Sequence, residues 1–244
     1  MRKLQLNYFL SLVLLGSLNL VFSQKAYYGK DYIHYEDSTS DYGKINHTVY
    51  LIGDAGEINE KGTSATGLLK NHLEKDGKNS TVLFLGDNVY PRGIPDKNHK
   101  DYNSSVNTLN QQLELFEKFE GQVYYIPGNH DWDRWSEDGW KSIKREADLI
   151  KKKGNDKIEF LPEDGCPGPI KVKLDKGVIL LIIDTQWWLH QYDKPYGENC
   201  DCEVKNEFQF IEEIKKIVLD NQDKQILLAG HHPVFSNGNH GGHF

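Results

Sequence analysis

The strongest constraint on the fold is a recurring junction in which a short apolar run ends in a residue type that binds metals, usually after a glycine. It occurs at Gly53-Asp54, Gly86-Asp87, Gly128-Asn129, Asp184-Thr185 and Gly230-His231. The apolar runs have the length and residue types of buried strands, and stretches with helical spacing lie between several of them. This alternation predicts an α/β fold.

The remaining patterns complete the expected set of elements. The predicted strands are 48–53, 81–85, 123–126, 158–160, 170–174, 178–183 and 225–229, and the predicted helices are 64–76, 106–119, 140–150 and 204–219. The strands on either side of Lys176-Gly177 are close enough to form a hairpin. We therefore expect mixed sheets, with an antiparallel pair beside parallel strands.

The position of the junctions indicates a shared site. In open α/β sheets the carboxyl ends of the strands meet at one crevice, so residues far apart in sequence come together there. Each junction alone is compatible with a turn or a helix cap, Asn129 with an Asx turn, and His231 with a hydrogen-bonded core histidine. Their ordered repetition favours a metal site.

Four motifs resemble those of the calcineurin-like metallophosphoesterases over roughly Val49 to His243. They are Gly-Asp-x-Gly at 53–56, Gly-Asp-Asn at 86–88, Gly-Asn-His-Asp at 128–131 and Gly-His-His-Pro at 230–233. Tyr90, three residues after Asp87, narrows the resemblance to the purple acid phosphatase branch, and His240 is similar to a histidine of its small tartrate-resistant members. The resemblance implies a four-layer α-β-β-α sandwich with mixed sheets.

The resemblance also implies a ligand set for two metal ions. Asp54, Asp87 and Tyr90 would hold one ion, and Asp87, Asn129 and His231 the other, with Asp87 bridging. Phenolate suits ferric iron, whereas amide oxygen and imidazole suit Zn, Fe(II) or Mn, so iron with a divalent partner is expected. Such a pair activates water for attack on phosphorus. The implied substrates are phosphate monoesters of small molecules or proteins.

Three further residues are expected to act in catalysis. His130 resembles the family's substrate-facing histidine, which binds phosphate or protonates the leaving oxygen, and we expect Asp131 to orient its ring. His240 matches a second pocket histidine, although a flexible loop over 237–243 is the alternative. Alternative functions are a phosphodiesterase of the same fold and a non-catalytic exported binding or assembly module.

One departure from the family pattern concerns the last ligands. The pattern continues to a Gly-His-x-His motif, which does not occur before Phe244. We expect either an N-terminal fragment of a longer protein or a metal-poor derivative, and we favour the fragment. Some exported bacterial proteins carry a membrane portion after such a domain, but no residue here supports one.

The net charge indicates which partners the protein can have, and its N-terminal residues indicate its compartment. The 29 basic and 36 acidic residues give a net charge of −7, which argues against nucleic acid as a partner. Residues 1–23 have a basic start, an apolar run too short for a membrane span and small residues before Gln24, as in a signal peptide. We expect a polar segment at 24–46, the phosphoesterase domain at 47–244, and export to the periplasm, the outer membrane or the medium.

The three cysteines fit an oxidising compartment. Cys200 and Cys202 are too close in sequence for an unstrained bridge. We therefore expect Cys166 to pair with one of them.

Overall fold

The computed structural model describes residues 45–56, 65–73 and 77–233 of the 244-residue chain. All of its helices and strands belong to one compact unit, Gly43–His232. The strands are β1 (Thr48–Ile52), β2 (Ser80–Phe84), β3 (Gln122–Tyr125), β4 (Ile158–Phe160), β5 (Ile170–Asp175), β6 (Val178–Ile182) and β7 (Gln225–Ala229). The α-helices are α2 (Ala65–Leu73), α3 (Tyr102–Glu114), α4 (Gly139–Lys153), α5 (Thr185–Leu189) and α6 (Glu207–Asp220).

The first sheet, sheet A, contains β1 to β4 in sequence order, and all of its strands are parallel. Helices α2, α3 and α4 provide the crossovers, which is what parallel neighbours require. Sheet A is therefore wholly parallel. The mixed pairing that the sequence predicts lies in the second sheet, which contains the antiparallel pair.

The second sheet, sheet B, has the order β5-β6-β7 and is mixed. Strands β5 and β6 form the predicted antiparallel hairpin around Lys176-Gly177, with a register irregularity between Lys173 and Asp175. Helix α6 then leads back to β7, which is parallel to β6. As a result, β6 and β7 both direct their carboxyl ends to the same edge.

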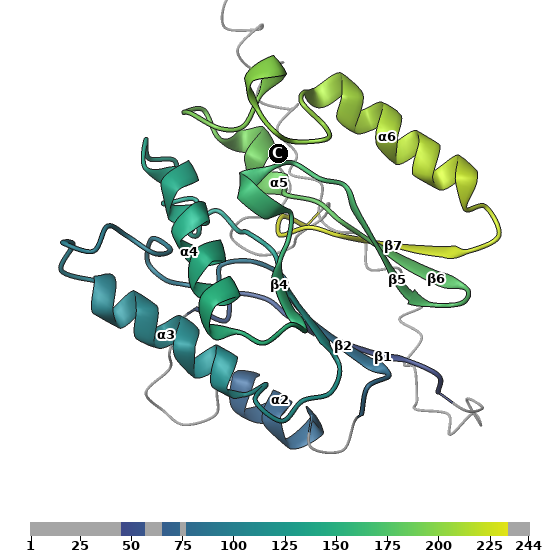
Figure 1. Ribbon diagram of the computed structural model, residues 1–244, viewed down its shortest axis with the longest axis horizontal. Coiled ribbons are helices and arrows are strands. Elements are labelled where there is room, and N and C mark those ends of the chain that lie inside the picture. Colours follow the sequence, from purple (N-terminus) through teal and green to yellow (C-terminus); the bar gives the residue numbers. More distant parts are fainter. Residues whose placement is uncertain (1–44, 57–64, 74–76, 234–244) are drawn as a thin grey trace, which may run out of the picture. The chain divides into compact units, whose positions relative to one another are not determined.

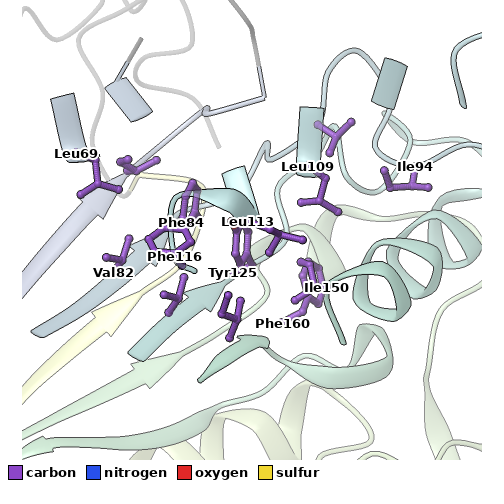
Figure 2. Close-up of a cluster of buried hydrophobic side chains, with 14 of the residues drawn as sticks. Leu69, Val82, Phe84, Ile94, Leu109, Leu113, Phe116, Tyr125, Ile150 and Phe160 are labelled. Atoms are coloured by element: carbon purple, nitrogen blue, oxygen red, sulfur yellow. The ribbon is translucent and has the colours of Figure 1, made fainter. Parts of the chain in front are cut away.

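Alternating side chains of the buried strands divide the core into layers. Val82 and Phe84 of β2 pack with helices α2, α3 and α4, whereas Leu83 between them packs toward sheet B. Figure 2 shows the first of these clusters, in which Phe84 stacks on Tyr125 at a ring distance of 4.2 Å. Ile217 of α6 covers the outer side of sheet B. The four-layer α-β-β-α sandwich is thus confirmed (Figure 1).

A disulfide joins Cys166 to Cys202. This is one of the two pairings that the sequence left open, and Cys200 is free. No helix in the described ranges has both the length and the apolar character needed to cross a bilayer.

Candidate metal centre

Parallel pairing brings the predicted junctions to one edge of the two sheets. Asp54 follows β1, Asp87 follows β2, Asn129 follows β3 and His231 follows β7. Backbone hydrogen bonds tie neighbouring junctions together: Asp54 N donates to the carbonyl of Gly86 (3.1 Å), and Gly56 N donates to that of Asp87 (2.9 Å). The sequence motifs therefore become one continuous set of loops.

The glycines of the motifs allow this close approach. A Cβ on Gly128 would lie 2.3 Å from Asp87 Oδ1. A Cβ on Gly86, whose φ is +93°, would lie 2.7 Å from His231 Nδ1 and 2.8 Å from the backbone nitrogen of Gly128. No side chain at either position can be accommodated without moving Asp87, His231 or the backbone of Gly128.

Asp87 lies at the centre of the candidate site and is only 3% exposed. Its backbone is left-handed, with φ of 55°, as is that of Asp54 (54°). Oδ1 accepts a hydrogen bond from His130 N at 2.9 Å and lies 3.4 Å from His231 Nε2. Oδ2 accepts from the hydroxyl of Tyr90 at 2.9 Å. The two oxygens of this carboxylate thus face two different groups of side chains.

Tyr90 links Asp87 to Asp54. Its hydroxyl lies 2.8 Å from Asp54 Oδ1 as well as 2.9 Å from Asp87 Oδ2, so one phenol proton serves two carboxylates. Burial, followed by these two carboxylates, raises the pKa of the phenol above its ordinary value. In the described part of the chain, no Lys or Arg forms an ion pair with either carboxylate.

On the other side of Asp87, His231 faces Asn129. Its Nδ1 lies 2.8 Å from the carbonyl oxygen of Leu85, which can only accept, so Nδ1 carries the hydrogen. The other ring nitrogen, Nε2, lies 3.1 Å from Asn129 Oδ1 and 3.4 Å from Asp87 Oδ1. Because both of these oxygens are acceptors, the three atoms repel one another unless a proton or a cation lies between them.

The donor set fits metal ions on chemical grounds. It combines two carboxylates, a phenol, an amide oxygen and an imidazole, all of which ligate first-row transition metals. The described residues contain no group of three or more His, Cys, Asp or Glu side chains close enough to hold one ion. An ion at this site would therefore need Tyr90 or Asn129 among its ligands.

His130 lies beside this set rather than within it. Its ring packs against Tyr90 at a centroid distance of 4.2 Å, and its Nε2 is 3.8 Å from Asp87 Oδ2. Nδ1 is 2.8 Å from the carbonyl oxygen of Pro91, so this nitrogen also carries a hydrogen. The ring is therefore oriented by a main-chain carbonyl. Every residue has such a carbonyl, so the sequence could not single out Pro91.

The prediction that Asp131 orients His130 is wrong. The Asp131 carboxylate is fully buried and accepts hydrogen bonds from the backbone nitrogens of Gly128 (2.7 Å), Asn88 (2.9 Å) and Val89 (3.2 Å). It joins the 86–90 loop to the 128–131 loop. Its physical role is to hold the loops that carry Asp87 and Asn129, because main-chain donors next to it satisfy its oxygens.

Two histidines remain: His240, the expected pocket histidine, and His232 of the Gly-His-His-Pro motif. His240 lies outside the described residues. His232 is half-buried, and its Nδ1 lies 2.8 Å from the hydroxyl of Thr185. Burial and the neighbouring His231 lower the pKa of His232 to about 4.

Asp184 also ends a strand but does not join the site. Its Oδ1 accepts from the backbone nitrogens of Gln186 and Trp187, which caps α5, and its Oδ2 accepts from the indole of Trp132 at 2.8 Å. Sequence reasoning missed α5 itself, a helix of five residues. It also assigned no role to two residues that are buried behind Asp87. These are Asn88, the last residue of the Gly-Asp-Asn motif, and Glu146.

Comparison with protein families identifies one match: the model of the calcineurin-like phosphoesterases covers residues 47–244. Comparison with curated proteins finds no match, and neither does comparison with solved structures.

Proposed function

The chain belongs to the calcineurin-like phosphoesterases, and we propose that it is an exported enzyme that hydrolyses phosphate monoesters at a two-metal centre. Metal-dependent phosphoester hydrolysis is the activity that this family indicates. One observation carries the two-ion proposal. Asp87 Oδ2 faces Tyr90, whose hydroxyl also contacts Asp54, whereas Asp87 Oδ1 faces His231, which contacts Asn129. A carboxylate placed in this way is suited to bridge two cations.

The proposed ligands are Asp54, Asp87 and Tyr90 for one ion, and Asp87, Asn129 and His231 for the other. When bound, two such ions lower the pKa of water and offset negative charge at the phosphoryl group. The residues themselves supply the geometry. Leu85 keeps the lone pair of His231 Nε2 directed at the site, and Asp131 holds the two loops at a fixed separation.

His130 is proposed as the general acid. Because Pro91 accepts the hydrogen on Nδ1, only Nε2 remains to give a proton, and it does so when the ring is an imidazolium. Its Nε2 lies on the side of Asp87 Oδ2, at 3.8 Å.

Iron is the proposed metal on the Tyr90 side, with Zn, Fe or Mn as its partner. A phenol whose pKa is raised would have to lose its proton to bind a metal, and the charge of a ferric ion held by Tyr90 would favour the phenolate. Iron-loaded protein should therefore show a visible phenolate charge-transfer band. Tyr90→Phe should abolish the band with the fold intact, and a band that survives this substitution would exclude Tyr90 as an iron ligand.

Export is proposed from residues 1–23, which lie outside the described residues. The disulfide between Cys166 and Cys202 supports an oxidising compartment. Fusion of residues 1–30 to a reporter that is active only after export, with a variant that replaces the apolar run by serines as control, tests this point.

Hydrolysis is tested on the full-length protein with an alkyl phosphate, an aryl phosphate and a phosphodiester, each with and without a chelator. We expect chelator-sensitive hydrolysis that is fastest on the monoesters. His130→Ala should reduce turnover of the alkyl phosphate far more than that of the aryl phosphate, whose leaving group needs no proton. Equal losses would remove the general-acid role, and faster diester cleavage would replace the monoesterase with a phosphodiesterase. Tight metal binding without hydrolysis would indicate a binding module.

A further inference from the structure

A buried polar cluster lies behind the candidate metal centre. Its members are Asn88, Asp131 and Glu146, each 0% exposed. Glu146 comes from α4, whose neighbouring buried positions Ile143 and Ile150 are apolar and pack in the core. A carboxyl group in such surroundings costs free energy that a leucine of similar size would not. Packing alone therefore does not explain it.

Asn88 connects this glutamate to the 86–90 and 128–131 loops, which carry Asp87 and Asn129. Its side-chain nitrogen lies 3.1 Å from Glu146 Oε1, 2.9 Å from the carbonyl oxygen of Ile126 and 3.4 Å from Asp131 Oδ2. Its backbone nitrogen donates to Asp131 Oδ1 at 2.9 Å. One amide group thus contacts the end of β3, the 128–131 loop and α4.

Asn88, the residue that these hydrogen bonds hold in place, directly follows Asp87 in the chain. Asp87 has a left-handed backbone, a conformation that persists in a non-glycine residue when the surrounding structure enforces it. Asn88 supplies that enforcement, and its side-chain amide donates to Glu146 of α4. Gln112 of α3 reaches the same residue through a different group, since its Nε2 donates to the carbonyl of Asn88 at 2.8 Å.

We propose that Glu146 is a positioning residue for the metal centre: its Oε1 holds the Asn88 amide and thereby fixes Asp87 relative to the 128–131 loop. The expected effect on metal binding rests on the proposed function. The expected effect on the position of the two loops does not depend on it. Glu146 touches none of the five proposed ligands, so it acts through Asn88 and through Asp131, whose carboxyl group it also contacts.

The structural content can be tested without metal, by hydrogen exchange of the metal-free protein. The backbone amides of His130, which donates to Asp87, and of Asn88, which donates to Asp131, report on the two loops. Glu146→Leu should accelerate exchange at both amides by about tenfold or more. Glu146→Gln keeps an acceptor oxygen in the same place and should leave both close to the wild type.

Ser142→Ala is the matched control, because Ser142 is also fully buried on α4 but its hydroxyl contacts the carbonyl of Ile94. This variant loses a buried polar contact without touching Asn88, so exchange at the two amides should not change. If Glu146→Leu does not fold, Asn88→Ala removes this hydrogen bond together with those to Ile126 and Asp131 and should give at least the same acceleration. Unchanged exchange in the folded variant, or equal acceleration in Ser142→Ala, would overturn the proposal.

The functional consequence is measured separately, by titration with Mn²⁺ and by kinetics on an aryl phosphate. Glu146→Leu should weaken metal affinity about 10- to 100-fold, the range found for residues that support metal ligands, and lower kcat more than it raises KM. Glu146→Gln should restore both. Wild-type protein that binds no metal would refute the proposed function and leave the exchange result standing. Accelerated exchange with unchanged Mn²⁺ affinity would refute the link between Glu146 and the metals.

Discussion

The loops after β2 and β6 each contain an aspartate close to the end of the strand, but the two aspartates have different roles. Each follows a buried strand with an aspartate, Asp87 in one and Asp184 in the other. Asp184 has an extended backbone, and its two oxygens accept from backbone nitrogens of α5 and from the indole of Trp132. Asp87 has a left-handed backbone and meets a phenol and an imidazole, while one main-chain nitrogen donates to it.

The comparison shows that the donors around a carboxylate decide its use. N–H groups satisfy Asp184 permanently, and a cation would have to displace them. The phenol of Tyr90 can give up its proton and become a ligand, and Nε2 of His231 directs a lone pair at the site, so the surroundings of Asp87 can accept a metal. The two regions should therefore respond to substitution in opposite ways.

The largest expected effect is the loss of metal from Asp87→Ala. Removing a proposed bridging ligand weakens both sites, so the Kd for Mn²⁺ should rise by more than about 100-fold, beyond the range typical of supporting residues. Asp184→Ala is the control and should bind Mn²⁺ like the wild type. Calorimetric titration distinguishes the two, and equal losses in both variants would break the distinction between the loops.

The second expected effect concerns the disulfide on the Asp184 side of the molecule. Pro167, next to Cys166, accepts a hydrogen bond from Asp184 N at 3.0 Å. The bridge closes a sequence separation of 36 residues, which in the chain-entropy model corresponds to about 4 kcal/mol. Cys202→Ser should lower the free energy of unfolding by about this amount, measured by urea denaturation.

Metal affinity should be unaffected by this substitution if the two regions are independent. Cys200→Ser, which removes the free cysteine, is the matched control and should change neither quantity. A Cys202→Ser variant that folds stably but loses metal would show that the Asp184 side supports the site directly.

A smaller loss of stability is expected from Asp184→Ala. It removes a helix cap, worth about 1 kcal/mol, and leaves the buried indole N–H of Trp132 without an acceptor, at about 1 to 3 kcal/mol. We expect the free energy of unfolding to fall by about 2 to 3 kcal/mol. A loss below about 0.5 kcal/mol would mean that these hydrogen bonds do not hold the loop.

The smallest expected effect is a pH dependence that Asp184 introduces. Burial raises the pKa of this carboxyl group to about 7, although the N–H groups around it oppose the shift. The native state therefore holds its proton more tightly than the unfolded chain, and the stability gained is complete below about pH 4 and lost as the pH rises through 7. Between pH 6 and 8 this amounts to about 1 kcal/mol.

Denaturation at both pH values, in the wild type and in Asp184→Ala, measures this difference. The variant should lose less stability than the wild type between pH 6 and 8. Identical changes in the two proteins would assign the pH dependence to other groups.

The strands, the hairpin and the strand-end motifs could be read from the sequence because they depend on local properties. Apolar runs such as 81–85 and 225–229 are recognisable as strands, and β4 and β7 lie at the predicted residues. The convergence of Asp54, Asp87, Asn129 and His231 followed from a general rule on parallel strands. Their roles as ligands remain a proposal.

The partners of buried polar groups could not be read in this way, because they come from distant parts of the chain. Asp131 was assigned to His130, its neighbour in sequence, whereas it holds nitrogens on two loops and the carbonyl of Pro91 holds the histidine. Glu146 lies in a helix whose sequence shows only a charged position, and its buried contact with Asn88 could not be read from that sequence.

Sequence by itself thus determined the strand order along the chain, the helical crossovers and the residue types at the strand ends, since these follow from periodicity and turn chemistry. Tertiary structure decided that sheet A is wholly parallel, that Cys166 pairs with Cys202 rather than Cys200, and that the indole of Trp132 donates to Asp184. These outcomes depend on which donors, acceptors and sulfur atoms meet in space. Local sequence carries no information on such contacts, because each is made with a segment far away along the chain.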